Sequence, residues 1–229
     1  MAASISKAIG TMRQEAELLL LDFDGTFYHF TDEFDSHCDD IAAKVLIELG
    51  VPGTFEELRE KGKESYQKHG SNFTIFHTMG IKIQDWHDIY HCYLEESYIS
   101  EFHVTARQLR DCTIPIAILS HSNRSWITRM LEKFGLTDVV PHDRIFGLED
   151  VDYLFKHDGE KVYRRVLEAL DIAASKAIMV EDSLRNLRPA KKIGMYTVWI
   201  THGKEFSQDQ HPYVDAAVKR LPDLLQGLT

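Results

Sequence analysis

Short apolar runs that alternate with helix-like segments are the feature of this sequence that most restricts its fold. The apolar residues within each run follow one another without alternating polar residues, which is typical of strands buried on both faces of a parallel sheet. Four runs are strong and two are weaker. The strong ones are residues 18–24 (LLLLDFD), 114–120 (IPIAILS), 176–182 (KAIMVED) and 195–200 (MYTVWI), and the weaker ones are 144–149 and 215–219.

Segments with helical periodicity fill most of the intervals between these runs. In residues 125–136 the apolar side chains recur at helical spacing until Gly135, and residues 161–172 and 184–195 follow the same pattern. Strands that alternate with helices predict an α/β protein. We expect a doubly wound, Rossmann-like parallel sheet with right-handed crossovers and helices on both faces.

The interval between the first two strong runs is different. Residues 33–110 are almost entirely helical in period, and Thr54 with Glu57 fits a capping box at a helix start. A βαβ crossover needs only about 10 to 12 residues. We therefore expect an α/β core of residues 1–30 and 108–229, with a helical domain of residues 31–107 inserted into it.

Composition narrows the range of partners. The chain of 229 residues has a net charge of −10, from 36 acidic and 26 basic side chains. An acidic protein is poorly suited to bind a nucleic-acid polymer, whereas a small phosphorylated substrate remains compatible because one metal ion can reverse the local field.

Three cysteines without a CxxC pair favour a reducing compartment. Without a signal peptide or a run of ~20 apolar residues, we expect a cytoplasmic protein that does not enter membranes. The sequence leaves the oligomeric state open.

The first apolar run leads directly into Asp22 and Asp24. Buried carboxylates are costly unless a metal or hydrogen bonds compensate them. An EF-hand loop is excluded because Phe27 stands where that loop requires glycine, and because the preceding run reads as a strand. A nucleotide-hydrolase strand end would need a GxxxxGK[ST] loop, which the sequence lacks. A loop acid pair that only caps the next helix remains the alternative to a catalytic site.

Polar side chains at the ends of other predicted strands favour the catalytic site. Ser120 ends the second strong run, and Glu181 and Asp182 end the third. Lys156 lies between these two runs, just before the predicted helix of residues 161–172. In an open α/β sheet, ligands bind beyond the carboxyl ends of the strands. One crevice would then collect two acid pairs, a hydroxyl and an ammonium group. A phosphoacceptor signalling domain uses similar residue types, but in another order and without a long helical insertion.

In their order along the chain, these residues resemble a known family. LLLLDFDGT, IAILS, Lys156 and MVEDS match the four motifs of the haloacid dehalogenase superfamily, and the resemblance extends from about residue 17 to the C-terminus. The helical insertion resembles that superfamily's small cap domain. Within it YQKHG (66–70), and later residues 181–200, resemble the pyrimidine 5′-nucleotidase branch.

The resemblance implies a mechanism for phosphate monoesters. Asp22 would attack phosphorus and form an aspartyl-phosphate, and Asp24 would protonate the leaving oxygen and then activate water. Asp22, the Asp24 backbone carbonyl and Asp182 would bind Mg²⁺, which offsets the repulsion between two anions. A dehalogenase of this superfamily lacks the second aspartate, because a halide leaving group needs no proton. Asp24 therefore favours phosphoryl transfer.

The remaining site residues are assigned by the same resemblance. Ser120 and Lys156 would hold phosphate oxygens and stabilise the transition state, with Glu181 as a supporting acid. Gly25 would let the backbone leave the strand sharply, and Thr26 would cap the turn.

Three positions after these motifs have more than one interpretation. His157 stands where the family usually has proline, so Lys161 is an alternative to Lys156. His121 is either a contact to phosphate or leaving group or, as we favour, a surface histidine. Asn123 either supports Ser120 or caps the following helix.

We therefore expect a Mg²⁺-dependent phosphatase of a small phosphorylated metabolite, with a nucleoside 5′-monophosphate favoured over a sugar phosphate. The cap would close over the site, exclude water and select the substrate. Tyr66, Lys68, His69 and Phe73 are its candidate recognition residues. A phosphomutase is the enzymatic alternative, and a non-catalytic binding protein on this fold is the alternative from another class.

Overall fold

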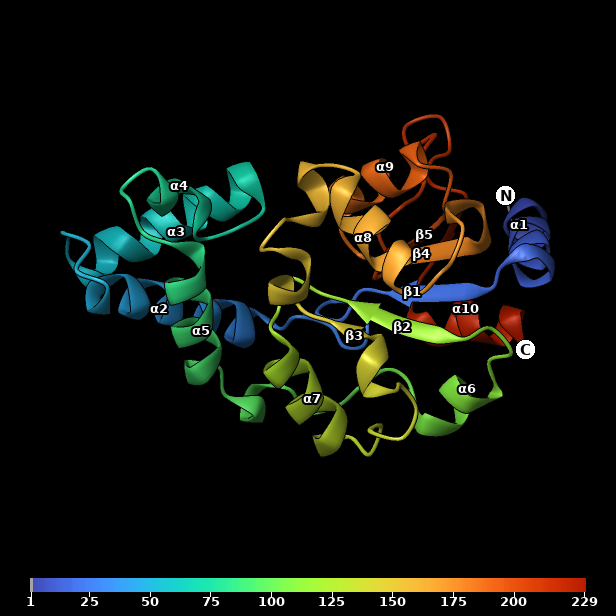
Figure 1. Ribbon diagram of the computed structural model, residues 1–229, viewed down its shortest axis with the longest axis horizontal. Coiled ribbons are helices and arrows are strands. Elements are labelled where there is room, and N and C mark those ends of the chain that lie inside the picture. Colours follow the sequence, from blue (N-terminus) through green and yellow to red (C-terminus); the bar gives the residue numbers. More distant parts are fainter. Residues whose placement is uncertain (1) are drawn as a thin grey trace. The chain divides into compact units, whose positions relative to one another are not determined.

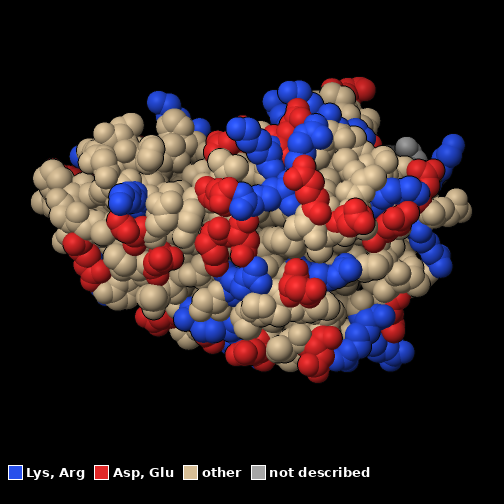
Figure 2. Space-filling view, viewed as in Figure 1, with Lys and Arg blue, Asp and Glu red and all other residues tan. Residues whose placement is uncertain are grey.

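The chain folds into two compact units in the computed structural model, which describes residues 2–229. One unit combines the segment up to His29 with Glu101–Thr229, and the other consists of Phe30–Ser100. Acidic and basic side chains are interspersed over the face seen in Figure 2.

The first unit contains a six-stranded sheet in which every pair of neighbours is parallel, in the order β3-β2-β1-β4-β5-β6. In Figure 1, β1 lies between β2 and β4. The order reverses between β1 and β4, which pair in register from Leu18 with Ala177 to Leu21 with Val180. The predicted doubly wound α/β sheet is confirmed. The strands are β1 (Leu18–Leu21), β2 (Ile116–Leu119), β3 (Ile145–Phe146), β4 (Ala177–Glu181), β5 (Tyr196–Ile200) and β6 (Ala216–Val218).

All residues of β1, β2 and β4 are buried, as strands covered on both faces require. Each strand is shorter than its apolar run, and β1 ends at Leu21, so Asp22 begins the loop. Because neighbouring parallel strands end at the same edge of the sheet, the residues that follow β1, β2 and β4 come together there.

Helices connect the strands of this unit. Asn123 caps α7, and the buried face of α8 contains Val162, Val166 and Leu167, as the sequence pattern predicts. The terminal helices α1 and α10, which contact each other, were not predicted. The helices are α1 (Ala2–Glu15), α6 (Ala106–Asp111), α7 (Arg124–Lys133), α8 (Lys161–Ala169), α9 (Leu184–Lys192) and α10 (Leu221–Leu228), with 3₁₀ turns η2 (His142–Arg144), η3 (Leu148–Val151), η4 (Lys156–Asp158) and η5 (Ala174–Lys176).

The second unit is helical. Its α2 contacts both α3 and α5, and Thr54 and Glu57 form the predicted capping box at the start of α3. Phe73 is buried with its ring 5.5 Å from that of Trp86, so it belongs to the core of this unit and is not exposed for substrate recognition. The elements are α2 (Asp32–Glu48), α3 (Phe55–His69), α4 (Thr74–His77), α5 (Ile83–Tyr93) and the 3₁₀ turn η1 (Glu96–Tyr98).

Among the described helices, none combines the length and the apolar character needed to span a membrane.

Candidate active site

Asp22 lies at the carboxyl end of β1. Its backbone N–H continues the sheet by donating to the Val180 carbonyl of β4 at 2.9 Å, and the residue is only 5% exposed. The chain then turns sharply, with Gly25 at a φ of +85°. The Thr26 backbone N–H donates to the Phe23 carbonyl at 3.1 Å, and the Thr26 hydroxyl donates to Asp22 Oδ2 at 3.3 Å. The turn therefore holds the Asp22 carboxylate at the sheet edge.

Lys156 brings a buried ammonium group to this carboxylate. Its Nζ donates to Asp22 Oδ1, to Glu181 Oε2 at 2.7 Å and to the Leu119 carbonyl at 3.3 Å, and the residue is 1% exposed. Three acceptors match the three hydrogens of the ammonium group. Lys161, the alternative from the sequence, is exposed at the first position of α8. The structure therefore brings Lys156 to the acids.

Three carboxylates share this buried space. One oxygen each from Asp22, Glu181 and Asp182 lies within 4.8 Å of the others. Burial, followed by the charge of Glu181, raises the pKa of Asp22 to about 8. Burial raises the pKa of Glu181 to about 7, and burial with the charge of Asp22 raises the pKa of Asp182 to about 6. Burial opposes the charge of Lys156, but the Asp22 and Glu181 carboxylates keep its pKa above the ordinary value.

One ammonium group cannot neutralise three carboxylates, so the cluster has excess negative charge when all are ionised. Hard, anionic oxygen atoms that lie close together are the donors that Mg²⁺ prefers. The residues present therefore fit a divalent cation at this edge of the sheet.

Asp24 lies beside the cluster but has different partners. Ser120 Oγ donates to its Oδ2 at 2.9 Å, while the Tyr28 hydroxyl and Trp126 Nε1, at 3.0 Å, donate to its Oδ1. All three donors are neutral. Of these, the sequence predicted only Ser120 as a site residue.

His121 and Asn123 have positions that favour structural roles. His121 is partly buried, and its Nε2 accepts a hydrogen bond from the Lys156 backbone N–H at 2.8 Å. His121 is therefore partly exposed, as a surface histidine would be, and it also binds the Lys156 backbone. Asn123 Oδ1 accepts from the Trp126 backbone N–H at 2.8 Å, which caps α7.

The loop after β5 also reaches the acid-bearing turn. His202 Nε2 lies 2.7 Å from the Gly25 carbonyl oxygen, and burial with the neighbouring His29 lowers the pKa of His202 to about 4. A Cβ atom on Gly25 would lie 2.8 Å from Asp182 Cγ. Glycine at this position thus permits the close approach of Asp182.

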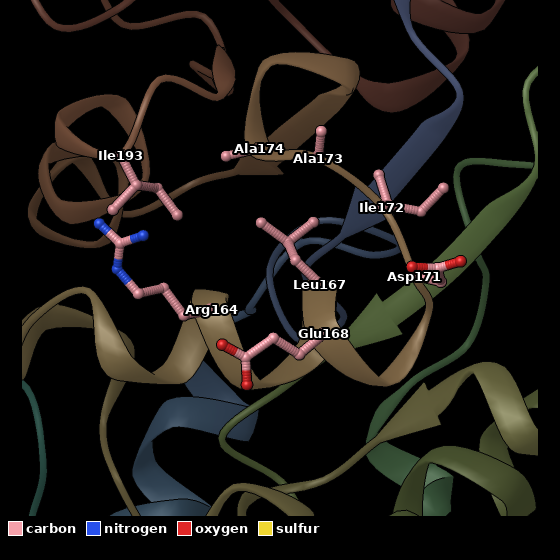
Figure 3. A pocket seen from close by; sticks show the side chains of 8 residues that line it. All are labelled: Arg164, Leu167, Glu168, Asp171, Ile172, Ala173, Ala174 and Ile193. Atoms are coloured by element: carbon pink, nitrogen blue, oxygen red, sulfur yellow. The ribbon is translucent and has the colours of Figure 1, made fainter.

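A separate cavity has a volume of about 390 Å³, and Figure 3 shows the side chains that line it. It is lined by residues between Arg164 and Ala174 and by Ile193. Residues 171–174 lead into the amino end of β4, whereas Glu181 and Asp182 lie at the carboxyl end. This cavity is therefore remote from the carboxylate cluster.

Comparison with known proteins identifies the class to which this site belongs. The family model described as "Haloacid dehalogenase-like hydrolase" matches residues 19–200. The chain belongs to the haloacid dehalogenase-like hydrolases, and the predicted superfamily and enzyme class are confirmed.

Individual relatives agree with this assignment. The chain is 26% identical over 204 residues to a glyceraldehyde 3-phosphate phosphatase of Pyrococcus furiosus. The matched residues cover 82% of each of the two chains. It is 27% identical over 124 residues to a phosphoglycolate phosphatase of Neisseria gonorrhoeae, covering 52% of this chain and 51% of that one. A solved hydrolase of the same superfamily, described as family IA, variant 3, from Entamoeba histolytica, has a similar fold. It superposes with a TM-score of 0.62 at 19% identity and covers 93% of this chain and 99% of its own.

Proposed function

We propose that this protein is a Mg²⁺-dependent phosphatase that hydrolyses a small phosphate monoester through an aspartyl-phosphate on Asp22. One observation carries the proposal. The Asp22 carboxylate, the Lys156 ammonium group and the Glu181–Asp182 pair meet at the sheet edge, and Asp24 follows two residues after Asp22. The names of both curated relatives support phosphomonoester hydrolysis.

Each residue has a role in this proposal. An Asp22 carboxylate oxygen attacks phosphorus, and the bond from phosphorus to the leaving oxygen breaks. Lys156 and Ser120 bind phosphate oxygens, and the positive charge of Lys156 stabilises the charge that develops there. Asp24 donates a proton to the leaving oxygen and, in the second step, accepts one from the water that hydrolyses the aspartyl-phosphate.

Asp22, Asp182 and the Asp24 backbone carbonyl would hold Mg²⁺, with Glu181 as a supporting acid that also anchors Lys156. The bound cation would supply the positive charge that lets an anionic nucleophile approach an anionic ester.

The substrate class is a small phosphorylated metabolite. The relatives act, by name, on glyceraldehyde 3-phosphate and phosphoglycolate, which favours a phosphate ester of a short carbon chain. A nucleoside 5′-monophosphate is the second candidate, and it rests on the segments 66–70 and 181–200. We assign substrate selection to the helical insertion, in which Tyr66 is 57% exposed.

Phosphate release tests the proposal. Purified protein is assayed with glyceraldehyde 3-phosphate, phosphoglycolate and a panel of nucleoside 5′-monophosphates, with Mg²⁺ or with EDTA, beside Asp22→Asn. We expect metal-dependent release that Asp22→Asn abolishes, and the preferred ester identifies the branch. Turnover without any added sugar bisphosphate would exclude a phosphomutase. If folded wild-type protein released no phosphate from any ester, the proposal would be wrong.

A further inference from the structure

The two oxygens of the Asp24 carboxylate have different partners. Oδ1 accepts hydrogen bonds from the Tyr28 hydroxyl and from Trp126 Nε1, at 3.0 Å for the indole. Oδ2 accepts a hydrogen bond from Ser120 Oγ at 2.9 Å. The carboxylate is therefore held from both sides, but by donors of unequal mobility.

The donors to Oδ1 are fixed by their surroundings. Tyr28 is 1% and Trp126 0% exposed. The Tyr28 ring stacks on Phe102 with centroids 5.7 Å apart, and Phe102 stacks on Phe134 at 4.1 Å. Trp126 lies in the first turn of α7, where its backbone N–H is bonded to the Asn123 side chain. Neither ring can turn away from Asp24 without repacking the core.

The donor to Oδ2 is free to reorient. A serine hydroxyl rotates about one bond and can donate or accept, whereas an indole N–H only donates. Ser120 Oγ also accepts from the Ser122 backbone N–H at 3.0 Å, which keeps the oxygen in place while its hydrogen turns. In the proposed phosphatase, Ser120 would direct this hydrogen to a phosphate oxygen of the substrate.

We propose that Tyr28 and Trp126 are positioning residues that fix Oδ1 of Asp24, so that Oδ2 is the oxygen that exchanges the proton with the leaving group and with water. The inference rests on the proposed function and assigns atoms within it. When Ser120 turns to the phosphate, Oδ2 becomes available while Oδ1 stays bound to its two donors.

The proton balance is closed over the two steps. In the first step, Oδ2 gives its proton to the ester oxygen as the phosphorus–oxygen bond breaks. In the second step, Oδ2 takes a proton from water as the water oxygen bonds to phosphorus and the bond to Asp22 breaks. Asp24 ends as it began, and no further reactant is needed.

A purely structural role for the two aromatic residues makes a different prediction. Buried tyrosine and tryptophan side chains usually find a hydrogen-bond partner, and in a purely structural role Asp24 would be only that partner. Loss of such a bond would lower stability and reduce activity towards all esters by the same factor. Loss of acid positioning would instead affect esters whose leaving group needs the proton.

The experiment compares two esters in Tyr28→Phe and Trp126→Phe. An alkyl phosphate has a poor leaving group, whereas p-nitrophenyl phosphate leaves with little need for a proton. We expect kcat/KM for the alkyl ester to fall about 10- to 100-fold and that for the aryl ester less than about 3-fold, with Asp24→Asn as the limiting case. Equal losses for the two esters, or no loss for either, would overturn the proposal.

Two control variants remove a tyrosine hydroxyl and a tryptophan indole N–H at positions that do not contact Asp24. Tyr196→Phe deletes another tyrosine–carboxylate bond, from Tyr196 to Glu15 at 2.5 Å. Trp86→Phe deletes an indole N–H that has no hydrogen-bond partner within the described residues. Both variants should leave the ratio of the two rates at the wild-type value.

A measurement without turnover separates this inference from the proposed function. In ¹⁵N-tryptophan-labelled protein, the Trp126 indole N–H resonance, assigned with Trp126→Phe, should move upfield in Asp24→Ala because the bond to the carboxylate is lost. A folded wild type that releases phosphate from neither of these esters nor from any ester of the metabolite panel refutes the proposed function. An indole resonance that does not move refutes the contact with Asp24, whether or not the enzyme is active.

Discussion

Asp22 and Asp24 are separated by one residue, but their carboxylates have opposite kinds of surroundings. Asp22 is buried with Lys156, Glu181 and Asp182, so charged groups determine its properties. Asp24 is partly exposed and accepts hydrogen bonds from three neutral donors. Buried charges change protonation and attract a cation, whereas neutral donors mainly fix orientation. The Asp22 carboxylate is therefore suited to be a nucleophile beside a metal. The Asp24 carboxylate is suited to be an acid that is held in one orientation.

The largest effect should come from removing the Asp22 carboxylate. We expect Asp22→Asn to lower phosphate release at least about 1,000-fold, because the nucleophile is lost. Its thermal stability without metal should be equal to or above that of the wild type. The raised pKa of Asp22 means that the fold disfavours the ionised carboxylate at neutral pH.

Activity assays and thermal unfolding in EDTA check both halves of this prediction. Asp24→Asn serves as the comparison, since it leaves the buried charges intact. A lower unfolding temperature in Asp22→Asn would mean that its pairing with Lys156 outweighs the repulsion within the cluster.

Removing the Lys156 ammonium group should have the opposite effect on stability. Lys156→Met leaves the buried Asp22 and Glu181 carboxylates without their cation, and breaking such a pair costs about 3–5 kcal/mol of unfolding free energy. Urea denaturation at pH 8 without Mg²⁺ measures the loss. Lys161→Met, at an exposed position, should stay within about 0.5 kcal/mol of the wild type. If the two substitutions changed the unfolding free energy equally, the ion pairs around Asp22 would contribute nothing to stability.

The charged surroundings of Asp22 were largely predictable from the sequence. Apolar runs predict the strands, and parallel strands bring their carboxyl ends to one edge. Asp22 directly follows four leucines, and Ser120 and Asp182 end two other runs, so short-range sequence determines where they lie. Lys156 needed the structure to distinguish it from Lys161, because its approach depends on a 3₁₀ turn outside the strands.

The surroundings of Asp24 were not predictable in the same way. Trp126 is 102 positions from Asp24 in the chain, and its indole reaches the carboxylate only because α7 begins where Asn123 caps it. No periodicity or motif marks the contact of Tyr28 with Asp24 or that of His121 with the Lys156 backbone. The terminal helices α1 and α10 were missed as well, although α10 has a buried apolar face.

Dependence on pH provides a subtler test of the charged cluster. Because the pKa of Asp22 is raised from 3.8 to about 8, the folded state binds more protons than the unfolded state across this range. The contribution of the protonated Asp22 carboxyl group to stability is therefore present at low pH and is lost as the pH rises towards 8. The difference in unfolding free energy between Asp22→Asn and the wild type should therefore increase with pH, as measured by urea denaturation in EDTA.

Metal binding should reverse that trend. Ligand carboxylates must be ionised, so Mg²⁺ should raise the unfolding temperature of the wild type more at pH 8 than at pH 6. Mg²⁺ should have a smaller effect on Asp22→Asn at both values. A pH-independent effect of Mg²⁺ would place the cation away from these carboxylates.

The smallest effect is expected at Gly25, which directly follows Asp24 and lies against Asp182 of the charged cluster. Gly25 has a φ of +85°, and a Cβ atom there would lie 2.8 Å from Asp182 Cγ. Gly25→Ala should therefore cost about 1–2 kcal/mol for its left-handed backbone and also displace a ligand of the proposed metal site. Gly135→Ala, at a φ of +66° with nothing within 4 Å of its Cβ, should show the backbone cost alone. We expect only Gly25→Ala to need more Mg²⁺ for half-maximal activity, with an unchanged ratio of alkyl to aryl ester hydrolysis. If that ratio also fell, Asp24 would not be held independently of the charged cluster, and the two environments would have to be treated as one.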